Sequence, residues 1–147
     1  MAFRLIKEKN PVNDEVKVPF IITMLGSGFF IGFIPVASGT FGSLIGLGLY
    51  LMPKMSEFYY LSLLLVLVFL IGIFCAEKMR GRYGEDPPQV IIDEVAGQLF
   101  TYLVGSVVFE LFFPFKSFDP ATAFDTKLVF GIIGFFLFRF FDIVKLE

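Results

Sequence analysis

The sequence predicts an all-α membrane protein, a polytopic helix bundle of about four membrane segments in which the first is broken or re-entrant. The first observation is composition: 56% of the 147 residues are hydrophobic, 22 are Phe, and the mean hydropathy is +0.81. A soluble domain of this size leaves too much surface in water to bury so many apolar side chains. The second observation is a series of long uncharged runs. We expect a polar lead-in over 1–17 and one membrane-embedded helical domain over 18–147.

The first uncharged run, between Lys17 and Lys54, is interrupted by Pro, Gly and hydroxyl residues over Pro35–Thr40. If the turn at Ser38–Ser43 faces the cytoplasm, each half has about 15 residues, which at ~1.5 Å per residue is short of a ~30 Å hydrocarbon core. A re-entrant leg is one way to account for this length, and a simple break in the segment is the other. The run Phe58–Ala76 is uncharged and mostly apolar, and it has the length of a membrane-spanning helix.

Two further membrane segments are expected, from near Pro88 to Phe109 and from Leu128 to Val144. Glu110–Lys127 contains two prolines and is predicted to be the loop between them. The hydrophilic stretch Glu77–Asp86 is predicted to be a loop as well, and it carries three basic residues: Lys78, Arg80 and Arg82.

Basic loops tend to stay in the cytoplasm, so we expect the loop Glu77–Asp86 on that side of the membrane. The third segment then starts, and the fourth ends, at the cytoplasmic side. Antiparallel packing would bring the charged residues at these two ends to the same depth.

Charge and composition exclude several classes of function. A net charge of −2 with dispersed basic residues gives no reason to expect a nucleic-acid partner. The chain has no His and a single cysteine, Cys75, which rules out the usual zinc sites and a disulfide framework. Any catalysis must use carboxylates, hydroxyls, Lys, Arg and a hard metal ion. An oligomer is compatible with the sequence.

The adjacent acids Asp93 and Glu94 open the third segment. Neighbouring residues of a helix point about 100° apart, so both can face one ion only near the helix start, with Asp93 as the helix cap. Glu94, Gln98 and Thr101 form a polar stripe that should face protein or water. The simpler interpretation is an acidic pair that marks the end of a membrane helix.

Arg139, Asp142 and Lys145 share one face of the fourth segment. They either neutralise one another, or Asp142 joins the metal-binding acids while Arg139 binds an anionic group with its planar guanidinium. Lys145 also has the position of a lysine that extends to the membrane interface.

Ser38-Gly-Thr-Phe-Gly-Ser43 enters an apolar helix. The free N–H groups there, with Gly39, Thr40 and Ser43, could bind a phosphate. Gly42-x-x-x-Gly46 is also a common pattern of closely packed membrane helices, and packing alone is the more frequent meaning of such a pattern.

Two or three carboxylates (Asp93, Glu94, Asp142) beside an arginine and a helix N-terminus favour Mg²⁺ and phosphoryl hydrolysis or transfer at the membrane surface. The competing classes are a small transporter or channel subunit with an ion path, and a structural helix-packing subunit. The shared depth of the charged groups favours the enzyme, because a path would need polar groups at several depths.

Four elements resemble, in order and spacing, the phosphatidylglycerophosphatase A family. They are Gly26-Ser-Gly28, Pro35-x-x-Ser-Gly-Thr-Phe-Gly-Ser43, Val90-Ile-Ile-Asp-Glu-Val-Ala-Gly97 and Phe138-Arg-Phe-Phe-Asp-Ile-Val-Lys145. The resemblance implies a bacterial Mg²⁺-dependent phosphatase that converts phosphatidylglycerophosphate, a membrane phospholipid, to phosphatidylglycerol and phosphate. It implies a multi-pass protein of the cytoplasmic membrane with its active site on the cytoplasmic side. Asp93, Glu94, Asp142 and Arg139 would be catalytic, the three acids would hold the metal, and Gly39, Thr40, Ser43 and Lys145 would bind the phosphate.

The chain departs from the family pattern at three places. Ser38 stands where the family usually has Pro, and Leu146 follows the lysine where Pro is usual. Family members continue through a Gly-rich stretch and an Asp-Asp pair, whereas this sequence ends at Glu147. The resemblance therefore leads us to expect a site without those two acids.

Overall fold

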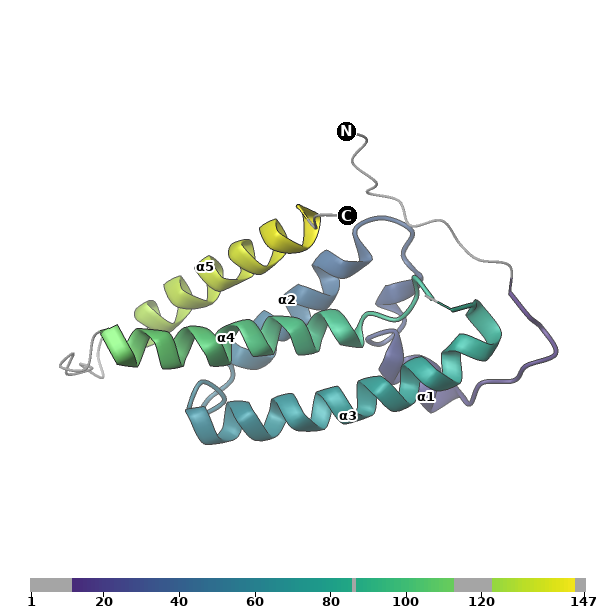
Figure 1. The fold of residues 1–147 in the computed structure, drawn as a ribbon, viewed down its shortest axis with the longest axis horizontal. Helices are drawn as coiled ribbons and strands as arrows, with labels where there is room; N and C mark the ends of the chain where they lie inside the picture. Colours follow the sequence, from purple (N-terminus) through teal and green to yellow (C-terminus); the bar gives the residue numbers. More distant parts are fainter. Residues whose placement is uncertain (1–11, 86, 113–122, 145–147) are drawn as a thin grey trace.

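The computed structural model describes residues 12–85, 87–112 and 123–144, and these residues form an all-helical bundle without a strand (Figure 1). The predicted all-α class is confirmed. Five α-helices lie within the described ranges, with one short 3-10 turn at Ile31–Phe33: α1 Phe20–Gly26, α2 Ser38–Leu51, α3 Phe58–Tyr83, α4 Ile92–Phe112 and α5 Ala123–Ile143.

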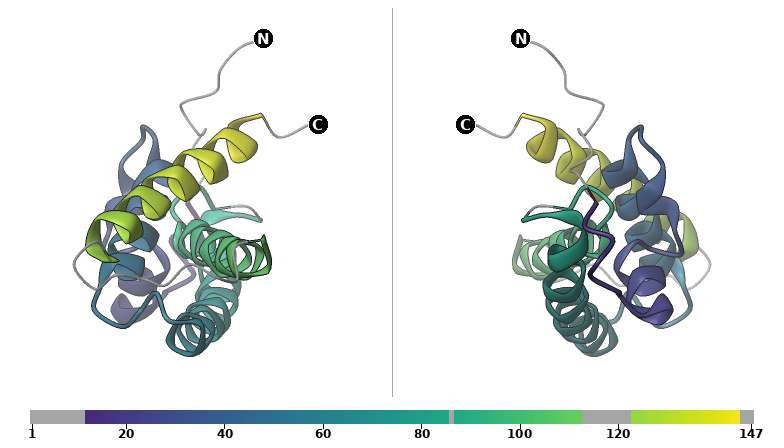
Figure 2. Two further views of the ribbon diagram at one scale, coloured as in Figure 1. Left: turned by 90° about the vertical axis from the view of Figure 1, so that its left-hand side faces the viewer. Right: turned by 90° about the vertical axis from the view of Figure 1, so that its right-hand side faces the viewer.

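Helix α4 is the centre of the bundle and contacts α2, α3 and α5 (Figures 1 and 2). The core beside it contains two stacked tyrosine rings, Tyr50 of α2 and Tyr102 of α4, whose centroids are 4.3 Å apart. The Tyr102 hydroxyl donates a hydrogen bond of 2.9 Å to the Gly131 carbonyl of α5. These contacts fix three helices relative to one another.

Glycines let α2 lie directly against α4. A Cβ atom built on Gly46 would be 2.8 Å from Cβ of Gln98, and one on Gly42 would be 2.8 Å from Cβ of Glu94. Both distances are too short for real atoms, so any side chain at either position would separate the helices. This is the close contact that the Gly42-x-x-x-Gly46 pattern indicates.

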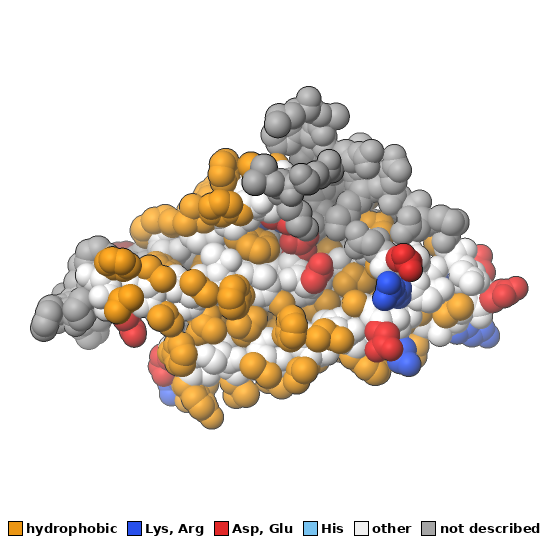
Figure 3. All heavy atoms as spheres, viewed as in Figure 1, with side chains coloured by type: hydrophobic (Ala, Val, Ile, Leu, Met, Phe, Trp, Pro, Cys, Tyr) orange, Lys and Arg blue, Asp and Glu red, His pale blue; other side chains and the backbone are white. Residues whose placement is uncertain are grey.

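Helices α3 and α4 are the two in the described part of the chain that are long and apolar enough to cross a membrane. Hydrophobic side chains cover much of the face over them, while basic and acidic side chains gather toward the end of α3 (Figure 3). Helix α2 has 14 residues, about 21 Å at ~1.5 Å per residue. The count of four membrane segments and the re-entrant first stretch remain predictions.

Both predicted loops are shorter than the sequence suggested. Helix α3 continues to Tyr83, so the expected loop Glu77–Asp86 is wrong over most of its length. Its Glu, Lys, Met and Arg side chains all favour helix, and the helix ends only before Gly84, at φ 94°. The expected loop Glu110–Lys127 overlaps the end of α4 and the start of α5. Its two prolines lie outside the described residues.

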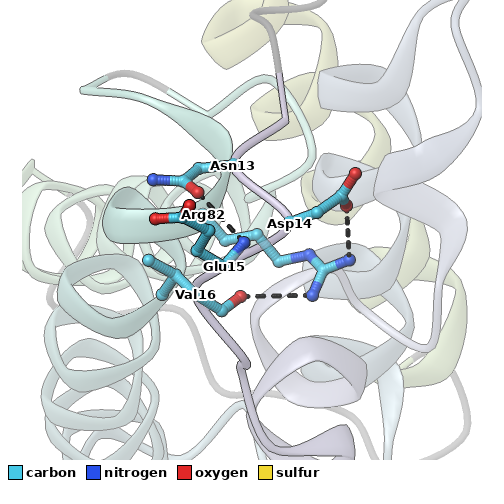
Figure 4. Close-up of polar contacts among 5 residues, drawn as sticks. All are labelled: Asn13, Asp14, Glu15, Val16 and Arg82. Atoms are coloured by element: carbon cyan, nitrogen blue, oxygen red, sulfur yellow. Dashed lines mark hydrogen bonds and ion pairs between the residues drawn. The ribbon is translucent and has the colours of Figure 1, made fainter.

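The described end of the lead-in is held against the end of α3 by Arg82 (Figure 4). The guanidinium donates to the Val16 carbonyl at 3.2 Å and pairs with Asp14 at 3.4 Å. The Asn13 N–H donates to the Arg82 carbonyl at 2.8 Å. Asn13, Asp14 and Glu15 of the predicted polar lead-in are exposed, and Arg82 ties this stretch to the end of α3.

Candidate functional site

Arg139 of α5 lies between two carboxylates. Its Nη1 atom is 2.8 Å from Oδ2 of Asp142, one turn further along α5, and 3.5 Å from Oε2 of Glu94 in the first turn of α4. The three side chains are 14%, 25% and 13% exposed, respectively. Limited contact with water strengthens the attraction between these charges. The antiparallel ends of α4 and α5 thus bring together three of the residues singled out in the sequence.

The first turn of α2 closes this cluster from the other side. A Cβ atom built on Gly39 would be 2.9 Å from Oε1 of Glu94 and 3.0 Å from Nη1 of Arg139. The preceding residue, Ala37, is in the left-handed conformation at φ 54° and has no side-chain oxygen to cap the helix. The first-turn N–H groups of α2 and the positive end of its dipole therefore lie beside Glu94 and Arg139.

The other three predicted phosphate-binding residues differ in their placement. Thr40 is half-buried in the first turn of α2, and its N–H donates to the Ala37 carbonyl at 2.9 Å. Ser43 is fully buried, and its hydroxyl donates to the Gly39 carbonyl at 3.1 Å, so its proton is used within the helix. Lys145 lies outside the described residues.

Asp93 faces a different surface from Glu94. It is exposed and borders an apolar groove between α3 and α4, about 640 Å³ in volume. Helix α4 begins at Ile92, so Asp93 lies within its first turn and not at the capping position expected from sequence. The rotation of about 100° between neighbouring helical residues puts the two acids on adjoining faces of α4.

The polar stripe predicted along α4 faces the protein over most of its length. Gln98 is fully buried beneath Gly46, and Glu94 is largely buried. The Thr101 hydroxyl donates to the Gly97 carbonyl at 3.0 Å, which satisfies it within the helix. The stripe therefore lies at the contact of α4 with α2 and α5.

The sequence analysis treated Gly42 as a packing residue alone, and it did not single out Gly72 and Ala76, the small residues on the α3 side of the groove. Gly42 also restricts the site, because a Cβ there would meet Glu94. The available signal for the groove was small residues recurring in segments otherwise filled by Leu, Ile, Val and Phe.

The donor set of this cluster suits a hard divalent cation. Two carboxylates, Glu94 and Asp142, share one guanidinium, which leaves an excess of one negative charge. Mg²⁺ is commonly held by one or two carboxylates and completed by water and phosphate oxygens. Among the described residues, no three Asp, Glu, His or Cys side chains gather as a metal-binding group. Glu94 and Asp142 thus fit such an ion as a two-carboxylate site.

Comparisons with known proteins place the chain among lipid phosphatases. The profile of the family described as phosphatidylglycerophosphatase A matches residues 24–146, which include all of the clustered side chains. A protein of Bacteroides thetaiotaomicron named "Putative phosphatidylinositol-3-phosphatase" is 34% identical over 131 residues, covering 86% of this chain and 72% of its own length. No solved structure matches the chain. The chain belongs to the phosphatidylglycerophosphatase A family, whose members are membrane enzymes that remove phosphate from lipids.

Proposed function

We propose that the protein hydrolyses phosphatidylglycerophosphate to phosphatidylglycerol and phosphate in an Mg²⁺-dependent reaction. The observation that carries this proposal is the cluster of Glu94, Arg139 and Asp142 against the first turn of α2 at Gly39. It joins an anion-binding guanidinium and helix N-terminus to two acids that suit a divalent cation. Family membership supplies the substrate class, a phosphate monoester on a lipid.

The cationic and the acidic groups of the site have different roles in this reaction. Arg139 binds the phosphoryl oxygens, and the N–H groups of Ser38 and Gly39 at the start of α2 donate to them, so both stabilise negative charge that grows during transfer. Glu94 and Asp142 would hold Mg²⁺, which supplies charge neutralisation and lowers the pKa of a bound water.

Water is the simplest nucleophile. Its oxygen forms the new bond to phosphorus, the bond from phosphorus to the lipid oxygen breaks, and one proton of the water ends on the leaving lipid alcohol. An aspartyl-phosphate formed on Asp93 or Asp142 is an alternative first step. In the metal assignment from sequence Asp93 is a third ligand, and its exposed carboxylate lies on the adjoining face of α4.

We infer that the site faces the cytoplasm from a multi-pass position in the bacterial inner membrane. Lys78, Arg80 and Arg82 stand on the last turns of α3, the end of α3 from which the chain turns back into α4. Glu94 lies in the first turn of α4. The basic residues and the site therefore occupy the same end of the bundle (Figure 1), and basic ends tend to remain inside.

The test is phosphate release by the purified protein in detergent micelles, with and without Mg²⁺ or a chelator. Phosphatidylglycerophosphate, phosphatidylinositol 3-phosphate and phosphatidic acid serve as parallel substrates, since the Bacteroides relative is named for the second. Asp142→Asn should lower turnover by about 10²-fold or more. Asp125→Asn is the matched control, since Asp125 is exposed and lies at the opposite end of α5.

If the protein hydrolyses one of the other two lipids faster, that lipid replaces phosphatidylglycerophosphate as the proposed substrate. If a chelator leaves the activity unchanged, the proposed dependence on Mg²⁺ is rejected. Ion flux through protein-containing liposomes without phosphate release would favour the channel hypothesis instead.

A further inference from the structure

An apolar groove runs between the two helices, among the described residues, that are both long and apolar enough to cross a membrane. It lies between α3 and α4, has a volume of about 640 Å³, and is bordered by one charged residue, Asp93. Pockets that bind small ligands usually have volumes of ~300–1,000 Å³. Hydrophobic side chains also cover much of the face of α3 and α4 that the space-filling view shows (Figure 3). The groove therefore has the size of a ligand site and walls suited to hydrocarbon.

The length of the groove matches the depth of one lipid leaflet. Its α3 wall extends from Leu65 to Ala76, which is about 16 Å at ~1.5 Å per residue. Half of a hydrocarbon core of ~30 Å is nearly the same distance. A hollow of this length that runs along the helices fits a single extended acyl chain.

The polar end of the groove is the end next to the candidate active site. Ala76 packs in the cluster that contains Ile92, and a Cβ built on Gly72 would be 3.3 Å from the Ile92 side chain. The groove thus begins at the first turn of α4, beside Asp93 and one residue from Glu94, and its other end lies at Leu65 and Phe100. A lipid whose chain lies in the groove has its head group at the level of Glu94 and Arg139.

We propose that this groove is the acyl-chain subsite of the enzyme and holds one chain of the phosphate-bearing lipid, an inference that rests on the proposed function. Hydrocarbon has little preference between lipid and an apolar wall, so the groove aligns the substrate more than it increases affinity. Alignment matters because a small displacement of the reacting phosphate can cost about 10²-fold in rate. Small residues, Gly72 and Ala96, give the groove its depth.

Substitutions test the alignment. Ala76→Phe fills the polar end of the groove, and Val107→Phe is the control on α4, exposed and away from it. Both variants are assayed with long-chain and very short-chain forms of the same phosphate lipid. Ala76→Phe should lower kcat/KM about tenfold for the long-chain form relative to the short-chain form, which is about 1.4 kcal/mol. Val107→Phe should leave this ratio unchanged, and an unchanged ratio in both variants contradicts the proposal.

Photo-crosslinking of the unmodified protein tests occupancy without relying on turnover or on a variant that folds. Phosphatidic acid and phosphatidylcholine, each with a diazirine in one acyl chain, are incorporated separately into phosphatidylcholine nanodiscs that contain the protein. Phosphatidic acid should label the groove residues, such as Ile73 and Phe100, about tenfold more than phosphatidylcholine does. Equal labelling by both lipids would show ordinary boundary lipid and overturn the subsite.

The two experiments separate the two proposals. Selective labelling without phosphate release from any lipid would reject the proposed function and keep a binding groove for phosphate lipids. Phosphate release with unselective labelling and an unchanged chain-length ratio would keep the function and reject the groove.

Discussion

Three glycines of α2 differ in what a methyl group would meet, which gives a sharp test of the site. At Gly39 the methyl would meet Oε1 of Glu94 at 2.9 Å and Nη1 of Arg139 at 3.0 Å, the far ends of two flexible side chains. At Gly42 it would meet Cβ of Glu94 at 2.8 Å and the Ile91 carbonyl oxygen at 2.9 Å, where backbone must move. At Gly48 nothing lies within 4 Å.

These distances predict a separation of activity from stability. Gly→Ala in a helix gains about 1 kcal/mol of helix propensity, and overpacking costs about 1–3 kcal/mol. For Gly39→Ala the charged ends can move aside, so the free energy of unfolding should stay within about 1 kcal/mol of the parent. The displaced charged groups should lower kcat by about 10²-fold. Gly42→Ala should lose about 1–2 kcal/mol because a backbone contact opens, and Gly48→Ala should be neutral or slightly more stable.

The assay pairs phosphate release from the lipid phosphate with thermal unfolding in detergent, followed by circular dichroism because the chain has no Trp. Gly48→Ala is the matched control, since it makes the same change in the same helix. Full activity in Gly39→Ala would refute the placement of the site at the start of α2. A loss of stability in Gly39→Ala as large as that in Gly42→Ala would refute the argument from flexible side chains.

Two further predictions concern other contacts. Arg139→Gln leaves Glu94 and Asp142 without their shared cation, so we expect about 2 kcal/mol lower stability in the same unfolding assay and loss of most activity. Arg139→Lys should recover stability better than turnover, because lysine lacks the planar guanidinium fork. Wild-type turnover in Arg139→Gln would contradict this prediction. Lys127 donates a 2.7 Å hydrogen bond to the carbonyl of Met52, the residue just after α2. Lys127→Met should therefore lower the free energy of unfolding by about 1 kcal/mol and leave kcat unchanged. An unchanged melting temperature would show that the hydrogen bond contributes nothing to stability.

Much of the site followed from sequence because two simple constraints determine it. Apolar length predicted the helices that became α3 and α4. Antiparallel packing predicted that the acids Asp93 and Glu94 would lie at the depth of Arg139 and Asp142, and of the two acids Glu94 pairs with Arg139. Hydropathy could not predict where α3 ends, because it marks only the apolar part of the helix. The charged residues that follow this part favour helix as well, so α3 continues through them.

The divergence of Asp93 from Glu94 was also beyond the sequence. Neighbouring positions had to differ by about 100°, but which acid faces α5 depends on the rotation of α4 about its own axis. That rotation is set by the contacts of α4 with Gly42 and Gly46, a three-dimensional fit of backbones. The groove between α3 and α4 depends on the same helix packing, so its position could not be predicted from the sequence either.

The glycines that allow α2 to approach α4 also affect the order in which the protein can assemble. Four of the 14 residues of α2 are Gly, and each is about 1 kcal/mol less favourable in a helix than Ala. Synthesis delivers α2 before α4, so for a time this weak and short helix lacks the neighbour that stabilises it. Arg139 arrives later still, on α5. The charged cluster thus joins α2 and α4 to α5, the last helix of the described bundle, so it can form only after α5 is in place.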